Sequence, residues 1–165
     1  MPKGKFKTKG IIIIVLLALI VLWGISKQAS DKSANKLGAI FTPNDVKIIS
    51  LGKSIYNENC ASCHGIKLEG AADWKSPNND GLMPAPPHDE SGHTWHHTDA
   101  LLFDITKYGL AKITNNENYK TNMPVYESIL SDDEIIAVLS YIKSTWSNEI
   151  KQRHDELNAA SVKVQ

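Results

Sequence analysis

The chain has 165 residues, enough for one compact domain and an appendage but too few for two sizeable cores. Basic and acidic residues balance at 18 each, but Lys3, Lys5, Lys7 and Lys9 all precede the first apolar run. Residues 27–165 therefore carry 14 basic and 18 acidic side chains, which argues against nucleic acid as a partner. The chain has only two cysteines, and both lie in one five-residue motif, which excludes a disulfide-stapled scaffold.

Residues 11–25 form an uncharged, almost wholly apolar run behind the four lysines. The run is longer than most signal-peptide cores and shorter than the roughly 20 residues of a comfortable membrane span. The small-residue cleavage pattern is weak at residues 24–26 and weaker at 27–29, whereas Trp23 suits a membrane interface. We therefore expect residues 1–26 to form a single-pass inner-membrane anchor or uncleaved signal, with the remainder of the chain on the periplasmic side.

Residues 27–41 are rich in Ser, Lys, Asn, Ala and Asp without a clear period, which predicts a flexible linker. A first helix is predicted to start within residues 42–45, with Thr42 as its hydroxyl cap, Pro43 in its first turn and Asp45 near its positive end. Apolar residues then recur at helical spacing up to the cysteines.

Two further helices are predicted in the outer domain, which we place at residues 42–148. One begins at Thr98-Asp99 and ends at Gly109. The other begins with a capping-box pattern at residues 131–134 and continues to Trp146. The charged composition of residues 149–165 predicts a helical extension or tail. No stretch of the sequence shows the alternation of apolar and polar residues that is typical of a strand. The fold class is therefore all-α, with about three main helices and long loops that need a large apolar ligand to complete a core.

Residues 60–64 read Cys60-Ala61-Ser62-Cys63-His64, and this C-x-x-C-H pattern is typical of covalent haem attachment. The two thiols form thioether bonds to the haem, and His64 then lies under the iron as its proximal ligand. A thioredoxin-like redox pair is disfavoured because such a pair opens a helix, whereas this one ends a helix. A zinc site is disfavoured because it needs further cysteines or ordered histidines nearby.

The outer domain resembles the class I monohaem cytochromes c over residues 43–147. In that family a glycine and an aromatic residue on the first helix cross an apolar and an aromatic residue on the last. The matching residues here are Gly52, Tyr56, Val138 and Tyr141. The resemblance implies the class I cytochrome c fold around one covalent haem c.

The resemblance also implies a sixth iron ligand from a methionine-proline loop, so that His64 and Met123 would be the metal ligands. Met123 stands in such a loop, before the last helix. Met83 also precedes a proline but lies in the region that, in the family, supplies a proline carbonyl to the proximal imidazole. Met83 and a histidine are the alternatives to Met123, and Met83 is otherwise expected to pack in the core. The candidates for the proline carbonyl are Pro84, Pro86 and Pro87.

Four of the six histidines fall within residues 88–97, beside two acids and Trp95, which departs from the family pattern. One interpretation is a second metal site for copper or zinc, and another is a pH-sensitive docking surface. The simpler interpretation is preferred because no spacing here imposes a ligand geometry. It places His97 near a helix start, has Trp95 packing on the haem or bonding a propionate, and leaves the other side chains in solvent. Trp74 is a further candidate to line the haem pocket.

Two axial ligands leave no open position on the iron, which favours electron transfer over catalysis. We therefore expect a membrane-tethered carrier of single electrons, and not an enzyme in its own right. Its partners would be redox proteins such as a respiratory complex or an oxidase. The alternatives are a haem subunit of a larger oxidoreductase, or a cytochrome with a second metal in residues 88–97.

Overall fold

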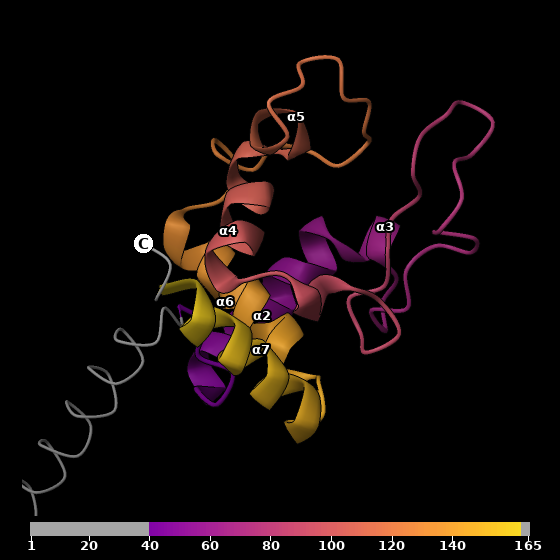
Figure 1. The fold of residues 1–165 in the computed structure, drawn as a ribbon. Coiled ribbons are helices and arrows are strands. Elements are labelled where there is room, and N and C mark those ends of the chain that lie inside the picture. Colours follow the sequence, from indigo (N-terminus) through magenta and orange to yellow (C-terminus); the bar gives the residue numbers. More distant parts are fainter. Residues whose placement is uncertain (1–39, 163–165) are drawn as a thin grey trace, which may run out of the picture. The chain divides into compact units, whose positions relative to one another are not determined.

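The computed structural model describes residues 40–162, and all regular structure in that range is helical (Figure 1). The elements are α2 (Val46–Asn59), α3 (Ala61–His64), the 3-10 turn η1 (Thr94–His96), α4 (Asp99–Tyr108), α5 (Leu110–Ile113), α6 (Asp132–Ser144) and α7 (Asn148–Val162). The all-α prediction is confirmed. The predicted anchor at residues 1–26 and most of the predicted linker lie outside the described residues. Within residues 40–162, no helix has the length and apolarity that a membrane span requires.

Helix α2 begins at Val46, later than predicted, and its cap is Asp45 instead of Thr42. The Asp45 carboxylate accepts hydrogen bonds from the backbone N–H groups of Lys47 (2.9 Å) and Ile48 (3.2 Å). Thr42 belongs to the preceding turn, where its carbonyl accepts from the N–H of Asp45 (3.1 Å). A carboxylate that satisfies two free N–H groups at the positive end of the helix dipole caps the helix better than a hydroxyl further upstream.

The predicted ends of α4 and the predicted start of α6 are confirmed. The Thr98 hydroxyl accepts from the N–H of Leu101 (3.3 Å), and α4 ends at Gly109, whose φ of 81° few other residues adopt. At α6, Ser131 and Glu134 form the reciprocal capping box. Helix α6 ends before Trp146, however, and α7 is a separate helix instead of its extension.

Helices α2 and α6 cross at the centre of the domain (Figure 1). Gly52 allows this contact, because a Cβ atom there would overlap the carbonyl oxygen of Ala137. Beside it, the rings of Tyr56 and Tyr141 pack with their centroids 5.6 Å apart. Val138, which the resemblance pairs with this crossing, is buried, but the closest approach is to the backbone of Ala137.

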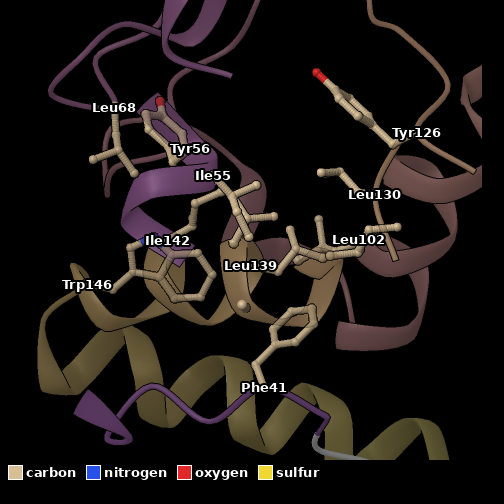
Figure 2. Packing of buried hydrophobic residues seen from close by; sticks show 13 residues of the cluster. Phe41, Ile55, Tyr56, Leu68, Leu102, Tyr126, Leu130, Leu139, Ile142 and Trp146 are labelled. Atoms are coloured by element: carbon tan, nitrogen blue, oxygen red, sulfur yellow. The ribbon is translucent and has the colours of Figure 1, made fainter. Parts of the chain in front are cut away.

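The apolar core lies around this crossing and extends to α4 and the segment before α6. Figure 2 shows Phe41, from the turn before α2, pointing into the same cluster as Leu139 of α6. The cluster consists of Phe41, Ile55, Tyr56, Leu68, Leu102, Tyr126, Leu130, Ile135, Ala137, Val138, Leu139, Ile142 and Trp146.

Helix α7 is joined to the rest of the domain by buried polar groups. The fully buried Asp99, at the start of α4, exchanges two hydrogen bonds with Asn158 of α7, both 2.8 Å long. The ammonium of Lys143 lies 3.8 Å from the same carboxylate and 2.6 Å from that of Asp155. Because a buried charge is costly unless it is paired, this arrangement fixes α4, α6 and α7 in one relative position.

His154 of α7 is fully buried beside this network. Its Nε2 lies 2.8 Å from the backbone carbonyl of His97, which only accepts, so Nε2 carries the proton. Burial and the nearby Lys143 ammonium lower the pKa of His154, while Asp99 opposes that shift. Its Nδ1 has no hydrogen-bond partner within the described residues, so the ring is neutral and a second proton would be a buried cation next to Lys143.

We predict that the stability of the domain depends on pH through His154. Because the pKa of His154 is lower in the folded protein than its ordinary 6.5, the unfolded chain binds more protons below about pH 6.5. The free energy of unfolding should therefore fall as the pH is lowered through about 6.5. His154→Gln keeps an N–H donor for the His97 carbonyl but does not titrate, so its stability should fall less steeply. Urea unfolding of both haem-loaded proteins at a series of pH values measures the two slopes, and equal slopes would contradict the neutral, buried ring.

Candidate functional site

The C-x-x-C-H motif lies where α2 gives way to α3. Cys60 ends α2, and its N–H donates to the carbonyl of Tyr56 (2.9 Å). The carbonyl of Cys60 in turn accepts from the N–H of His64 (2.9 Å), so the motif forms one continuous helical turn. Cys60 is half-buried and Cys63 is exposed, and both are free thiols.

The chemistry of these thiols does not suit a redox-active pair. Burial raises the pKa of the Cys60 thiol to about 11, so it stays protonated at neutral pH. Catalytic thiol pairs work through a thiolate whose pKa is lowered instead. Nor do three His, Cys, Asp or Glu side chains gather into a metal-holding group anywhere in residues 40–162.

The imidazole of His64 is buried and has a fixed tautomer. Its Nδ1 lies 2.9 Å from the carbonyl oxygen of Pro86, which selects Pro86 among the three proline candidates. A carbonyl only accepts, so Nδ1 carries the proton and the lone pair lies on Nε2. Burial lowers the pKa of His64, against the smaller opposite effect of this hydrogen bond. The ring is therefore neutral, which is the form that binds a metal.

Gly70 allows the proline segment to approach His64. Its φ is +71°, and a Cβ atom there would overlap the backbone nitrogen of Pro87. The N–H of Gly70 donates to the carbonyl of His64 (2.8 Å), and that of Ala71 donates to the carbonyl of Ala85 (2.8 Å). Two segments of the loop are thus hydrogen-bonded to each other beside the His64 imidazole, although neither forms a helix or a strand.

Two buried tyrosines connect the surrounding loops to the motif. The Tyr56 hydroxyl donates to the carbonyl of Gly65 (2.9 Å), and the Tyr126 hydroxyl donates to that of Asn59 (2.7 Å). Burial raises the pKa of both, that of Tyr126 to about 12, so both are protonated donors at neutral pH. Tyr126 follows Met123 by three residues, so its bond ties the methionine loop to the residue before Cys60.

The two candidate methionines have different surroundings. Met123 is half-buried, and its N–H donates to the Thr121 hydroxyl (3.0 Å) in the loop that Tyr126 holds. Met83 lies in the long loop between α3 and η1 with 49% of its surface exposed. The prediction that Met83 packs in the core is therefore wrong, because among residues 65–93 only Leu68, close to α3, joins the apolar cluster.

Two histidines of residues 88–97 stack on tryptophan rings, and His97 contacts the ring of His93 edge-on (5.4 Å between centroids). His93 stacks on Trp74 (5.3 Å between centroids), and His96 stacks on Trp95 (3.6 Å). The Trp95 indole N–H donates to the carbonyl of Glu90 (3.3 Å). The described residues thus give no support to a copper or zinc site in this loop.

His88 is the site residue that the sequence interpretation did not single out. Its ring lies face to face with that of His64, with centroids 4.0 Å apart and planes 19° from parallel. The one feature of the sequence that could have indicated this role is that His88 follows Pro86 by two residues, on the segment that reaches the His64 imidazole.

The sequence of this domain matches those of known proteins. A family profile for cytochrome c matches residues 49–146, which is more than half of the chain. The chain belongs to the cytochrome c family. It is 30% identical over 95 residues to cytochrome c6 of Tetradesmus obliquus, a match that covers 57% of this chain and 86% of that protein.

Two further relatives are cbb3-type cytochrome c oxidase subunits FixP. The one from Bradyrhizobium diazoefficiens is 23% identical over 155 residues, 88% of this chain and 49% of that subunit. The one from Sinorhizobium medicae is 22% identical over 96 residues, 58% of this chain and 29% of that subunit. The chain therefore spans about half or less of the FixP subunits that it matches. No solved structure matches this chain.

Membership in the family confirms the class I monohaem assignment and implies a covalently bound haem c. The residues present fit that group. A neutral imidazole offers its Nε2 lone pair, two free thiols stand on the same turn, and a half-buried thioether lies in a loop tied to that turn. This donor set, a soft sulfur and an imidazole, suits haem iron.

We predict that the Tyr126 hydroxyl stabilises the site. Tyr126→Phe removes the bond to the Asn59 carbonyl and should lower the free energy of unfolding by about 1 kcal/mol. Tyr141→Phe is the matched control, because the Tyr141 hydroxyl makes no hydrogen bond within residues 40–162. Urea unfolding of the two haem-loaded variants measures the difference, and an equal loss in both would show that the Tyr126 bond contributes nothing specific.

Proposed function

We propose that this cytochrome carries single electrons between redox partners, through one haem c held by Cys60, Cys63, His64 and Met123. The observation that carries the proposal is the neutral His64 imidazole, fixed by the Pro86 carbonyl within a C-x-x-C-H turn. Haem c, when bound, supplies a one-electron couple between ferric and ferrous iron.

Each of these residues has a distinct role in the proposal. Cys60 and Cys63 form the thioether bonds that keep the cofactor in a small domain. His64 provides the proximal ligand through Nε2, while Pro86 holds the Nδ1 proton and thereby the tautomer. Met123 would bind the iron through its thioether sulfur, which would leave no position on the iron for a substrate.

Electrons would pass by outer-sphere transfer at the surface near the motif. Transfer of this kind needs only a small, short-lived contact between the partners. The proposed partners are redox proteins such as a respiratory complex or an oxidase.

We also propose that residues 1–26 anchor the chain in the inner membrane, with the haem domain on the periplasmic side. The support is the sequence itself, in which four lysines precede an apolar run that ends near Trp23. Residues 27–39 would then link the anchor to the domain.

A second candidate is a haem subunit of a larger oxidoreductase. It is favoured by the two relatives that are oxidase subunits, one of which matches over 88% of this chain. Extraction of the full chain in mild detergent separates the two candidates. Further subunits that co-purify in fixed proportion would favour the complex, and a cytochrome that purifies alone would favour the mobile carrier.

We predict that Met123→Ala abolishes the weak methionine-to-iron charge-transfer band of the oxidised protein, because the substitution removes the thioether. Met83→Ala is the matched control, since Met83 also precedes a proline but is exposed, and it should keep the band. Optical spectra of the oxidised proteins give the answer. The reduced Met123→Ala protein should also bind carbon monoxide more readily than wild type. A band that survives in Met123→Ala would refute the ligand assignment.

We predict that the mature protein keeps its N-terminal run. Intact mass measurement should show that residues 1–26 are retained and that one haem is attached, and the protein should stay with membranes after an alkaline wash. Leu17→Lys places a charge in the middle of the run, which costs about 3 kcal/mol on insertion, and should release part of the protein. Leu17→Val is the control. A mature chain that starts near Lys27 would instead identify a cleaved signal.

A further inference from the structure

His88 makes a contact with His64 that neither the C-x-x-C-H motif nor the methionine loop explains. The two imidazole rings are nearly parallel, with 4.0 Å between centroids and 19° between planes. Flat rings at this separation are in van der Waals contact over their faces. One face of the His64 ring is therefore covered by a second imidazole.

The ring of His88 is itself held in place. Its Nδ1 lies 2.9 Å from the hydroxyl oxygen of the buried Thr94, and that hydroxyl donates to the carbonyl of Pro87 (3.3 Å). The hydrogen bond to Thr94 holds the His88 ring at Nδ1, whichever of the two groups donates. The backbone carbonyl of His88 accepts from the indole N–H of Trp146 (2.9 Å), so the main chain is held as well.

The bond to Pro86 alone does not define the orientation of the His64 ring. Hydrogen bonds tolerate donor angles down to about 150° with little loss, so one bond leaves the ring a range of tilts. A flat side chain against one face narrows this range, because tilting the ring would drive it into its neighbour.

We propose that His88 is a positioning residue for the proximal ligand, whose stacked ring fixes the plane of the His64 imidazole. This inference rests on the proposed function, in which His64 binds the iron. The plane of an iron-bound imidazole contributes, together with the other iron ligand, to the pattern of electron spin over the haem. The positioning role would therefore have a spectroscopic signature that simple packing lacks.

The test uses the oxidised, haem-loaded full chain and its paramagnetically shifted haem methyl resonances. His88→Phe keeps a flat ring and should keep the wild-type order and spread of these resonances. His88→Leu fills a similar space without a flat face and should change them, as should His88→Ala. His96→Ala is the matched control, because His96 lies on the same loop but stacks on Trp95 instead of His64.

The outcomes separate this inference from the proposed function. A wild-type protein without shifted methyl resonances, or a His64→Ala protein with an unchanged haem spectrum, would refute His64 as the ligand. With the ligand established, His88→Leu and His88→Phe spectra that resemble each other would overturn the positioning role. That comparison decides the question even if His88→Ala fails to take up haem. A change in His96→Ala equal to that in His88→Leu would likewise overturn it.

Discussion

The hydrogen bond between His64 Nδ1 and the Pro86 carbonyl is the constraint on which the rest of the site depends. A proximal imidazole can offer its Nε2 lone pair only if the proton stays on Nδ1, and a carbonyl 2.9 Å away holds it there. No helix presents this carbonyl, because residues 65–93 contain no helix or strand. The loop reaches His64 because Gly70 has no Cβ atom to collide with Pro87, and because Ala71 and Ala85 pair beside it.

An irregular loop holds its position only if other elements support it, and here the support comes from the C-terminal part of the domain. The indole of Trp146 binds the carbonyl of His88, His154 binds that of His97, and Glu90 binds the N–H of Ser147. Helix α7 lies beyond residues 49–146, which the family profile matches, so this part of the support comes from outside the matched region. The polar contacts of α7 are suited to holding the loop in place, because buried hydrogen bonds are directional, whereas apolar packing alone would let the loop shift along the helix.

The sequence predicts what local interactions decide and misses what tertiary contacts decide. The capping box at Ser131 and the stop at Gly109 are properties of a few neighbouring residues, and both predictions are confirmed. The exposure of Met83 depends on the path of a long loop, and the spacing of apolar residues in the sequence does not predict that path. Helix α7 was expected only as a charged extension because the side that it buries carries His154 and Asn158, so no apolar stripe marks it. His88 was hidden for a related reason, since a cluster of histidines suggests metal, whereas each of these rings packs on a different neighbour.

The position of the first described residues bears on how such a domain would exchange electrons. The N–H groups of Ile40 and Phe41 donate to the Asp99 carboxylate (2.7 and 2.9 Å), and that of Thr42 donates to the Ser140 hydroxyl (3.0 Å). These bonds fix the chain at the N-terminal end of α2, whereas Cys60 lies at its C-terminal end. A helix of 14 residues is about 20 Å long, so the point of attachment and the haem-binding turn are separated by that distance. In the proposed tethered carrier this separation would let a partner approach the turn that contains Cys63 while residues 40–42 stay bound to α4 and α6.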